Sequence, residues 1–259
     1  FSGEAKAPKI IGGRYGLASK DTTPDDIFAL YRNMQSPECK PEFTLAINDD
    51  VTHLSLPRSQ HIDTTEKGTV SCRFWGMGSD GTVGANKNTI KIIGDQTDLA
   101  VQAYFSYDSK KSGGLTISDL RFGRQAINQP YLVNSADFVS CSQQSYVFKY
   151  DMLDDLKPGG SFLLNSIWTA ADLERFLPAA YKRKIAEKNI KFYLIDAYKL
   201  AKEVGLGKRT NTVLQAAFFA VAKVLPLEQA ATYLQEYVAS FYKMKGEEIV
   251  QMNLRAVKA

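Results

Sequence analysis

Glycine-rich segments carry the residues of this chain that are best suited to chemistry. The first spans residues 12–16 and holds Arg14 and Tyr15 beside Gly16. Backbone amides next to glycines, together with a guanidinium group, suit a phosphate, and an aromatic ring can stack on a heterocycle. Taken alone, this pattern predicts an anion site only weakly, because a turn with a solvated arginine is the simpler interpretation.

A second segment, Gly76-x-Gly78-x-x-Gly81, lies between a predicted strand and a predicted helix. This context is typical of dinucleotide-binding turns, in which the N–H groups of the helix hold a pyrophosphate. Such sites carry an acidic residue about 20 positions later that binds the ribose. The end of the next predicted strand lacks that acid, because Asp108 follows it in a loop rich in lysine and glycine. The missing acid favours a tight structural turn over a dinucleotide site, and both interpretations stay open at this point.

Two further loops offer charged side chains. Lys110 and Lys111 precede two glycines and could contact a phosphate, although a solvated loop tip is an equally good interpretation. Asp50 and Thr52 lie at the end of a predicted strand, beside one of the two histidines of the chain. They could bind a metal or transfer protons, but with two histidines we find no catalytic triad and no paired-histidine metal site. We expect no catalytic residue and no metal ligand in this chain.

The composition is that of an ordinary globular protein. Of the 259 residues, 44% are hydrophobic and 23% are charged, which is enough for one large domain or two small ones. The 32 basic and 28 acidic residues are scattered and give a net charge of +4, so no basic surface for nucleic acid is indicated. No segment approaches the roughly 20 consecutive apolar residues of a membrane span.

The cysteines and the first residues bear on the cellular compartment. Cys39, Cys72 and Cys141 are far apart and odd in number, which predicts free, mostly buried thiols rather than disulfides or a metal cluster. Residues 1–9 lack the apolar core of a signal peptide, so we expect a soluble, cytoplasmic protein. Because the chain starts at Phe1, we also expect it to be a piece of a longer polypeptide.

Apolar periodicity predicts alternating helices and strands in the first half of the chain. Thr23, followed by a proline, caps a helix that we expect to pack on the core through Ile27, Leu30, Tyr31 and Met34. Further elements are predicted as strands at residues 43–47, 70–74 and 99–105 and as a helix at 81–94. The last two strands and the helix between them form a predicted β-α-β unit.

The alternation continues in the second half. It predicts strands at residues 136–139, 162–164 and 192–195, helices at 147–156 and after Thr169, a break at 158–160, and helical structure from 197 onward. The predicted fold is therefore α/β, with a mostly parallel sheet, helices on both faces and a helical C-terminal segment. We predict one α/β domain at residues 1–225, of which 1–66 could be an excursion from the main sheet, and a helical segment at 226–259.

Three ordered segments of the sequence resemble the central γ-type domain of pyruvate:ferredoxin (flavodoxin) oxidoreductases. They are residues 12–17 with Ser19 and Lys20, residues 49–53 with 55–57, and residues 74–76 with 78–88. The likeness continues at residues 104–114, 120–123, 136–139 and 204–207. It covers nearly the whole chain, and long matches in a fixed order are specific.

The resemblance implies the chemistry of the intact enzyme. Such enzymes oxidatively decarboxylate pyruvate on thiamine diphosphate with Mg²⁺, pass electrons through 4Fe-4S clusters to ferredoxin or flavodoxin, and release acetyl-CoA. The domain that this chain resembles packs against the thiamine domains and helps to bind coenzyme A. For this chain the resemblance implies coenzyme A contacts at Arg14, Tyr15, Gly16, Asp50, Thr52, Lys110 and Lys111.

The same resemblance implies partners and a place in the cell. The partners are the other domains of the oxidoreductase and ferredoxin or flavodoxin, and neither nucleic acid nor a membrane is expected. The intact enzyme is expected to be a homodimer in the cytoplasm, or in a hydrogenosome or similar organelle of an anaerobic eukaryote. Alone, the chain is expected to be colourless and inactive, because its sequence lacks cluster ligands in register and a complete thiamine site.

Two alternatives of other classes stay open at this point. One is a scaffold domain like the related domain of sulfite reductase flavoprotein subunits, whose role is not pyruvate chemistry. The other is a self-contained nucleotide-dependent dehydrogenase. The missing ribose-binding acid argues against the second, as does the lack of a catalytic histidine or Tyr-Lys pair.

Overall fold

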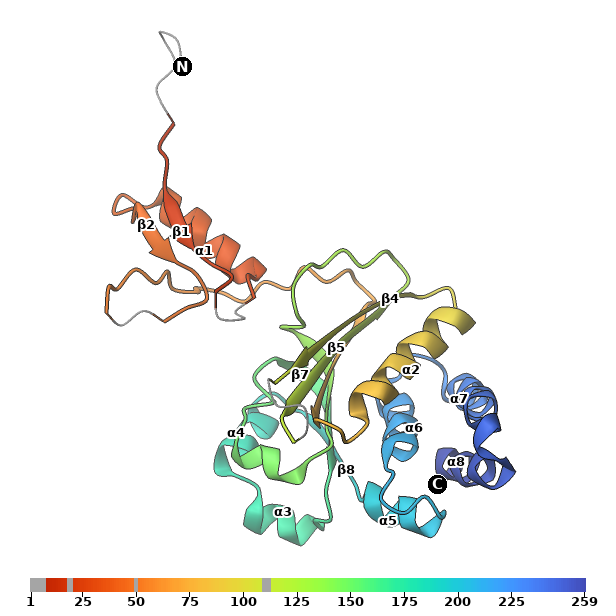
Figure 1. Ribbon diagram of the computed structural model, residues 1–259. Helices are drawn as coiled ribbons and strands as arrows, with labels where there is room; N and C mark the ends of the chain where they lie inside the picture. The colour runs from red at the N-terminus through yellow and green to blue at the C-terminus, as the bar shows by residue number, and fades with distance from the viewer. Residues whose placement is uncertain (1–7, 18–20, 49–50, 109–112) are drawn as a thin grey trace. The chain divides into compact units, whose positions relative to one another are not determined.

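The computed structural model describes residues 8–17, 21–48, 51–108 and 113–259. These residues fall into two compact units. The small unit is drawn from residues 1–65 and 129–132, and the large unit from residues 66–128 and 133–259. The labels β1, β2 and α1 mark the small unit, and all other labels mark the large one (Figure 1).

The large unit is built on a sheet whose six described strands have the order β4-β5-β3-β6-β7-β8. They are β3 (Val70–Met77), β4 (Ala100–Tyr107), β5 (Leu115–Gly123), β6 (Ala136–Cys141), β7 (Leu156–Asn165) and β8 (Lys191–Ile195). β3, β6, β7 and β8 run parallel, whereas β5 runs antiparallel to both β3 and β4. The predicted mostly parallel sheet is confirmed. In the predicted β-α-β unit, however, β5 lies between the two parallel strands β3 and β4.

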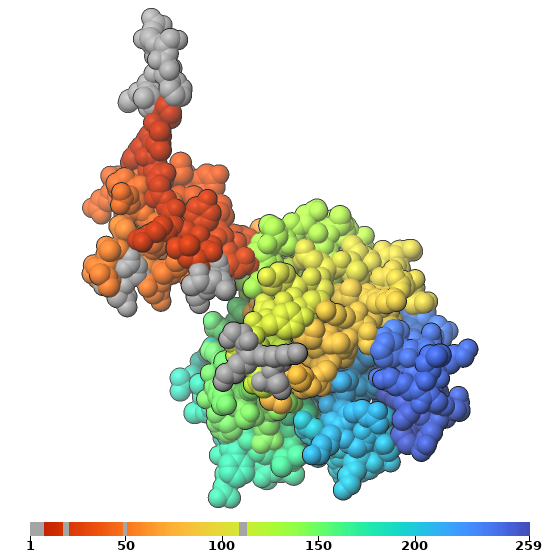
Figure 2. Space-filling model, in the orientation of Figure 1, coloured from red at the N-terminus to blue at the C-terminus, as the bar shows by residue number. Residues whose placement is uncertain are grey.

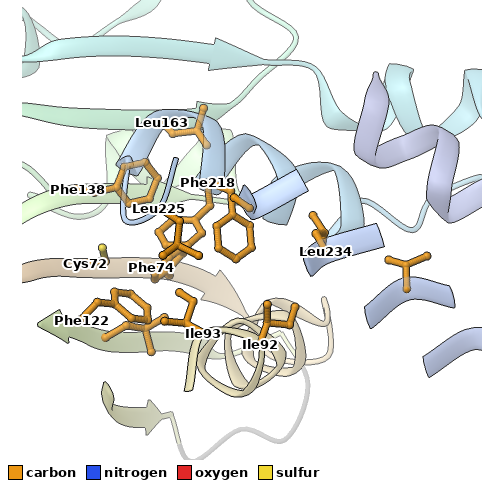
Figure 3. Packing of buried hydrophobic residues seen from close by; sticks show 14 residues of the cluster. Cys72, Phe74, Ile92, Ile93, Phe122, Phe138, Leu163, Phe218, Leu225 and Leu234 are labelled. Atoms are coloured by element: carbon orange, nitrogen blue, oxygen red, sulfur yellow. The ribbon is translucent and has the colours of Figure 1, made fainter. Parts of the chain in front are cut away.

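Helices cover both faces of this sheet, as predicted. They are α2 (Thr82–Gln96), η1 (Gln144–Phe148), α3 (Ala170–Phe176), α4 (Ala179–Glu187), α5 (Ala197–Glu203), α6 (Asn211–Ala222), α7 (Leu227–Tyr242), η2 (Lys243–Lys245) and α8 (Glu247–Lys258). On one face, α2, α6 and α7 enclose a cluster that includes Phe74, Phe138 and Phe218 (Figure 3). On the other face, η1, α3 and α4 cover a second cluster around Phe162 and Tyr181.

The helical C-terminal segment is confirmed and packs on the first of these faces. Leu234 and Val238 of α7 belong to the same cluster as side chains of β3 and β6. The blue C-terminal helices lie beside the gold segment that contains α2 (Figure 2). The predicted division of the chain at residues 225 and 226 stays a prediction. No helix in the described part of the chain is long and apolar enough to cross a membrane.

The helix predicted at residues 147–156 is wrong. The chain there forms η1 and a turn, and β7 begins before the predicted break at 158–160. Val147 and Met152 are buried although no continuous helix joins them. Their spacing therefore resembled that of a buried helix face without forming one. Gly159 takes a φ of +74°, and the pairing of β6 with β7 shifts register nearby. A bulge in the strand therefore accommodates the proline and glycines.

The small unit contains two short parallel strands and a helix. β1 (Gly12–Arg14) pairs with β2 (Glu42–Thr44), and α1 (Pro24–Gln35) lies between them in the chain. Buried apolar residues of the unit are Ala29, Phe43, Leu45 and Tyr131. Tyr131 comes from the 129–132 segment, whose Leu132 N–H donates to the Asp21 carboxylate at 2.5 Å. The core of the small unit therefore depends on a residue that is distant in sequence.

The helix α1 is confirmed, but the prediction of its buried face is wrong. Ile27, Tyr31 and Met34 are 43%, 58% and 51% exposed, whereas Asp25 and Asp26 are buried. Carboxylates are buried only where bonds to them compensate for the lost water. The acidic face of α1 therefore faces inward because partners elsewhere in the unit bind it, and the apolar stripe faces outward.

These partners come from the segment that follows β2. Arg58 donates to Asp26 from Nε at 2.7 Å and from its terminal nitrogen at 2.8 Å. The Ile62 N–H donates to Asp25 at 2.7 Å, and His61 Nδ1 lies 3.2 Å from the same carboxylate. Burial alone would raise the pKa of Asp26, but the bonds from Arg58 and from the helix cap outweigh it and hold that pKa below its ordinary value. The helix thus fixes the path of residues 55–62.

Candidate functional site

The small unit brings two of the predicted loops to one edge. Arg14, the last residue of β1, pairs with Thr44 of β2, and the Leu45 N–H donates to the Arg14 carbonyl at 3.0 Å. Thr44 also forms a parallel bridge with Ser55. Parallel segments send their following loops out at the same end of a sheet. The loop after Arg14 and the loop after Thr44 therefore leave the sheet side by side.

The glycines of the first loop have distinct structural roles. Gly16 has a φ of +66°, a conformation that L-residues avoid. A side chain at Gly13 would collide with the ring of Phe43, so this glycine lets β1 lie against the core. Between them, Tyr15 is 61% exposed. Residues 12–14 form β1 instead of the predicted turn, and residues 15–17 follow as an exposed loop. The ligand of Arg14, Tyr15 and Gly16 stays a prediction.

The second loop is strained at both of its described ends. Ala46 and His53 have φ values of 59° and 55°, in the left-handed region that costs a residue with a side chain about 1–2 kcal/mol. At the C-terminal end of the loop, Lys40 Nζ donates a hydrogen bond to the His53 carbonyl at 2.7 Å. Thr52 lies exposed in the turn, and Asp50 lies outside the described residues. Strain of this kind clusters at ligand sites.

A hollow of about 780 Å³ opens beside this loop, within the small unit. It is lined by Ala46, Ile47, Asn48, Ser55, Leu56, Pro57 and Arg58. Within this lining, Ser55 Oγ donates to the Ile47 carbonyl at 2.6 Å. The volume falls in the range of about 300–1,000 Å³ that small-molecule sites occupy. The site predictions missed this hollow, since its walls come together only through the pairing of Thr44 with Ser55.

The Gly76-x-Gly78-x-x-Gly81 turn of the large unit is organised around an acidic side chain. Asp80 accepts the Met77 N–H and the Thr82 N–H at 2.8 Å each, and the Ser142 hydroxyl at 2.7 Å. The carboxylate thus takes the position at the start of α2 that a bound phosphate takes in a dinucleotide site. Gly81, with a φ of 86°, leaves room for the side chain of Asn211. These contacts give the glycines of the turn a structural role.

The two lysines predicted as phosphate contacts belong to the other unit. Lys110 and Lys111 fall in the loop between β4 and β5 and lie outside the described residues. The described part of that loop is tied to the glycine turn, because the Gly78 N–H donates to the Gly114 carbonyl at 2.7 Å. Their role in binding stays a prediction.

The three cysteines are free, as predicted, and Cys72 and Cys141 are buried in β3 and β6. Burial raises the pKa of the Cys72 thiol well above its ordinary value and that of Cys141 to about 12. Iron–sulfur clusters need grouped thiolates. Among the described residues, no group of three or more His, Cys, Asp or Glu side chains could hold a metal ion. These cysteines therefore do not fit a 4Fe-4S cluster.

Comparison with known proteins connects this chain to one enzyme family. Residues 71–259 match the family model described as Pyruvate ferredoxin/flavodoxin oxidoreductase. The chain is 55% identical over 253 residues to the pyruvate-flavodoxin oxidoreductase of Klebsiella pneumoniae, covering 97% of this chain and 22% of that protein. It is 53% identical over 248 residues to the pyruvate:ferredoxin oxidoreductase of Moorella thermoacetica, covering 96% and 21%. The chain thus spans about a fifth of the length of these relatives.

Solved structures share the fold at lower identity. A pyruvate oxidoreductase subunit of Thermotoga maritima matches 74% of this chain and 94% of its own with a TM-score of 0.57 and 16% identity. A 2-oxoglutarate:ferredoxin oxidoreductase of Magnetococcus marinus, solved with 2-oxoglutarate, coenzyme A and succinyl-CoA, matches 74% of this chain and 30% of its own with a TM-score of 0.55 and 20% identity. On the family model and the sequence identities, this chain belongs to the pyruvate ferredoxin/flavodoxin oxidoreductase family.

Proposed function

We propose that this chain works as one part of an oxidoreductase that decarboxylates pyruvate to acetyl-CoA and passes the electrons to ferredoxin or flavodoxin. The names of its relatives support this activity. The 4Fe-4S clusters belong to other parts of such an enzyme, because the cysteines of this chain do not fit a cluster. Thiamine diphosphate with Mg²⁺ is assigned to other parts because the resemblance implies thiamine domains outside this chain. The chain itself supplies binding surfaces and no catalytic residue.

The binding surface is the edge of the small unit, and its ligand is coenzyme A. The observation that carries this proposal is the exposed Arg14-Tyr15-Gly16 segment beside the strained loop that contains Thr52. Coenzyme A has a diphosphate and a 3′-phosphate, which a guanidinium and open backbone amides bind well, and an adenine that stacks on an aromatic ring. Asp50 of the same loop is a further candidate contact. Lys110 and Lys111, which belong to the large unit, stay separate candidate phosphate contacts.

The apolar stripe of α1 is the surface that packs against the thiamine domains. Ile27, Tyr31 and Met34 recur at helical spacing and are about half exposed. An apolar stripe at this spacing ordinarily marks the buried side of a helix. Since α1 turns its acidic face to its own unit, the stripe is available to the rest of the enzyme.

The remaining parts of the proposal follow the family. The intact enzyme is a homodimer, acts in the cytoplasm, and has neither nucleic acid nor a membrane as partner; a hydrogenosome or similar organelle is the alternative location. A scaffold role like that in sulfite reductase flavoprotein subunits is not favoured, because the relatives reported above are named for pyruvate oxidation. A nicotinamide site at the glycine turn is opposed by the Asp80 carboxylate at the start of α2.

Steady-state kinetics of an Arg14→Ala variant of the intact oxidoreductase tests the coenzyme A site. Loss of a charge-assisted contact worth about 1.5–3 kcal/mol raises the apparent KM for coenzyme A by roughly one to two orders of magnitude. Formation of the thiamine radical in a single turnover without coenzyme A persists, because that step needs no contact from this loop. Arg124→Ala, an exposed arginine of the large unit, is the matched control and leaves both readouts unchanged.

The two readouts separate the possible failures. An unchanged coenzyme A dependence in Arg14→Ala removes this residue from the site. A radical yield that falls together with the coenzyme A dependence shows instead that the variant damages the fold or the packing on the thiamine domains.

A further inference from the structure

The large unit has the topology that places ligands at a defined point. β3 and β6 are neighbouring parallel strands. The chain leaves β3 through α2 toward β4, on one side of the pair, and leaves β6 through η1 toward β7, on the other side. In open α/β sheets, the crevice at the carboxyl ends of two such diverging strands is the usual ligand site.

A cavity lies at this point. Its volume is about 20 Å³, which is room for one water-sized group. Its lining includes Trp75, Asn86, Ser140, Ser142, Asn211 and Gln215. The lining therefore combines the ends of β3 and β6 with the first turns of α2 and α6, all within the large unit.

Two side chains of the lining, Trp75 and Asn86, each have a buried donor that makes no hydrogen bond within the described part of the chain. Asn86 is only 4% exposed, and within the described part of the chain its Nδ2 makes no hydrogen bond. The neighbouring amide is satisfied, because Gln215 Nε2 donates to Thr89 Oγ1 at 2.8 Å. Buried donors without acceptors are rare in folded proteins, and a bound water or ion is a common acceptor for them.

The second helix start at the cavity adds positive potential. In the described structure, Thr210, the N-cap of α6, makes no side-chain capping bond, and Asn211 lies against Gly81 at the start of α2. Lys208 and Arg209 directly precede this helix and are exposed. An N-terminus of a 12-residue helix, preceded by two cations, favours an anion.

From these features we propose that the cavity is a binding site for a small oxyanion, a carboxylate or a phosphate. One oxygen enters the cavity and accepts the hydrogen bond from Asn86 Nδ2. The rest of the anion lies at the mouth, near the first turn of α6, with Lys208 and Arg209 balancing its charge. The nearby Asp80 does not prevent this, since two backbone N–H groups and the Ser142 hydroxyl already bind its carboxylate. The site is independent of coenzyme A.

Thermal unfolding of the 259-residue chain in sodium phosphate, sodium acetate and sodium chloride at equal ionic strength tests the proposal. Phosphate, acetate or both raise the Tm above its value in chloride, and the anion that does so identifies the class. Asn86→Leu abolishes this rise and, in chloride, is at least as stable as the wild type because it removes an unpaired buried donor. Asn88→Leu, which changes an asparagine of the same helix outside the cavity, keeps the rise.

An exposed pair of substitutions keeps the test decisive if Asn86→Leu does not fold. Lys208→Ala with Arg209→Ala weakens the anion affinity about ten-fold, as expected for lost charge-assisted contacts. Lys199→Ala with Lys202→Ala, which removes the same charge from exposed positions on α5, leaves it unchanged. The proposal is overturned if neither phosphate nor acetate raises the Tm above its value in chloride, or if Asn86→Leu retains the full rise in Tm. It is also overturned if the double variant at Lys208 and Arg209 and the double variant at Lys199 and Lys202 lose anion affinity equally.

Discussion

The two units of this chain are stabilised in different ways. The large unit buries an apolar cluster on each face of its sheet. The small unit has two three-residue strands and relies on buried carboxylates, an arginine and the inserted Tyr131. Their glycine loops differ too: the turn in the large unit is organised around Asp80, whereas the loop after Arg14 is exposed. A glycine motif therefore indicates a ligand site only after the partners of its donors are known.

The largest expected effect is loss of an aromatic side chain from the large unit. Phe138 is 1% exposed and contacts Phe74 and Phe218 with ring centroids 5.7 and 5.4 Å apart. Phe138→Ala removes these contacts and leaves a cavity, so the free energy of unfolding falls by about 3–5 kcal/mol. Urea unfolding followed by circular dichroism measures it. A loss below about 1 kcal/mol would show that this cluster does not dominate the large unit.

The next effect is confined to the small unit. Asp26→Asn removes the charge that Arg58 and the Thr23 cap bind, at a cost of about 2 kcal/mol. Hydrogen exchange then speeds up in α1 while the amides of β3 and β6 keep their protection. Asp95→Asn, at an exposed position on α2, is the control and changes neither region. Faster exchange throughout the chain would contradict independent stabilisation of the two units.

Acid is expected to destabilise the small unit at a higher pH than the large unit. The pKa of Asp26 is lowered by folding, so its contribution to stability is present above its ordinary pKa of about 4 and is lost as the pH falls through the lower folded value. Exchange of α1 amides, measured below pH 4, therefore increases before that of the large unit. Arg58→Ala removes a bond that lowers this pKa and moves the transition to higher pH. An unchanged transition in Arg58→Ala would rule out Asp26 as its cause.

The smallest effect is expected at the apolar stripe of α1. Tyr31→Ser changes the stability of the 259-residue chain by no more than about 0.5 kcal/mol, because the side chain is 58% exposed. Phe43→Ala, in the core of the same unit, costs about 3–5 kcal/mol and serves as the buried counterpart. Chemical unfolding of the small unit compares them. Equal losses would mean that the stripe already packs within this chain.

The parts of the fold that the sequence predicts are those with local signals. Thr23 and Pro24 mark the start of α1, and the glycine turn marks the start of α2. β5 gave no such signal, since its inward residues include Asp119, whose partner Arg73 lies 2.7 Å away on another strand. The prediction of the buried face of α1 was wrong for the same reason. Asp26 is buried because it binds Arg58, which is 32 positions away in the sequence. Long-range ion pairs override apolar periodicity in both cases.

In the candidate site, too, the local features could be predicted from the sequence, whereas the features formed by distant segments could not. The glycines around Arg14 are a local feature and could be predicted, whereas the strand β1 that they form could not, because it depends on pairing with β2. The hollow beside Ala46 and Ser55 could not, because parallel pairing of distant segments forms it. The structural role of Asp80 needed the position of Ser142, a residue 62 positions away.

Hydrogen exchange of the intact oxidoreductase with and without coenzyme A tests the central claim most directly. The account predicts that saturating coenzyme A slows exchange in peptides covering residues 12–17 and 46–58, and that Arg14→Ala removes this protection at the same coenzyme A concentration. Slowed exchange in other parts of the enzyme, with these two segments unaffected, would contradict a coenzyme A site on the small unit.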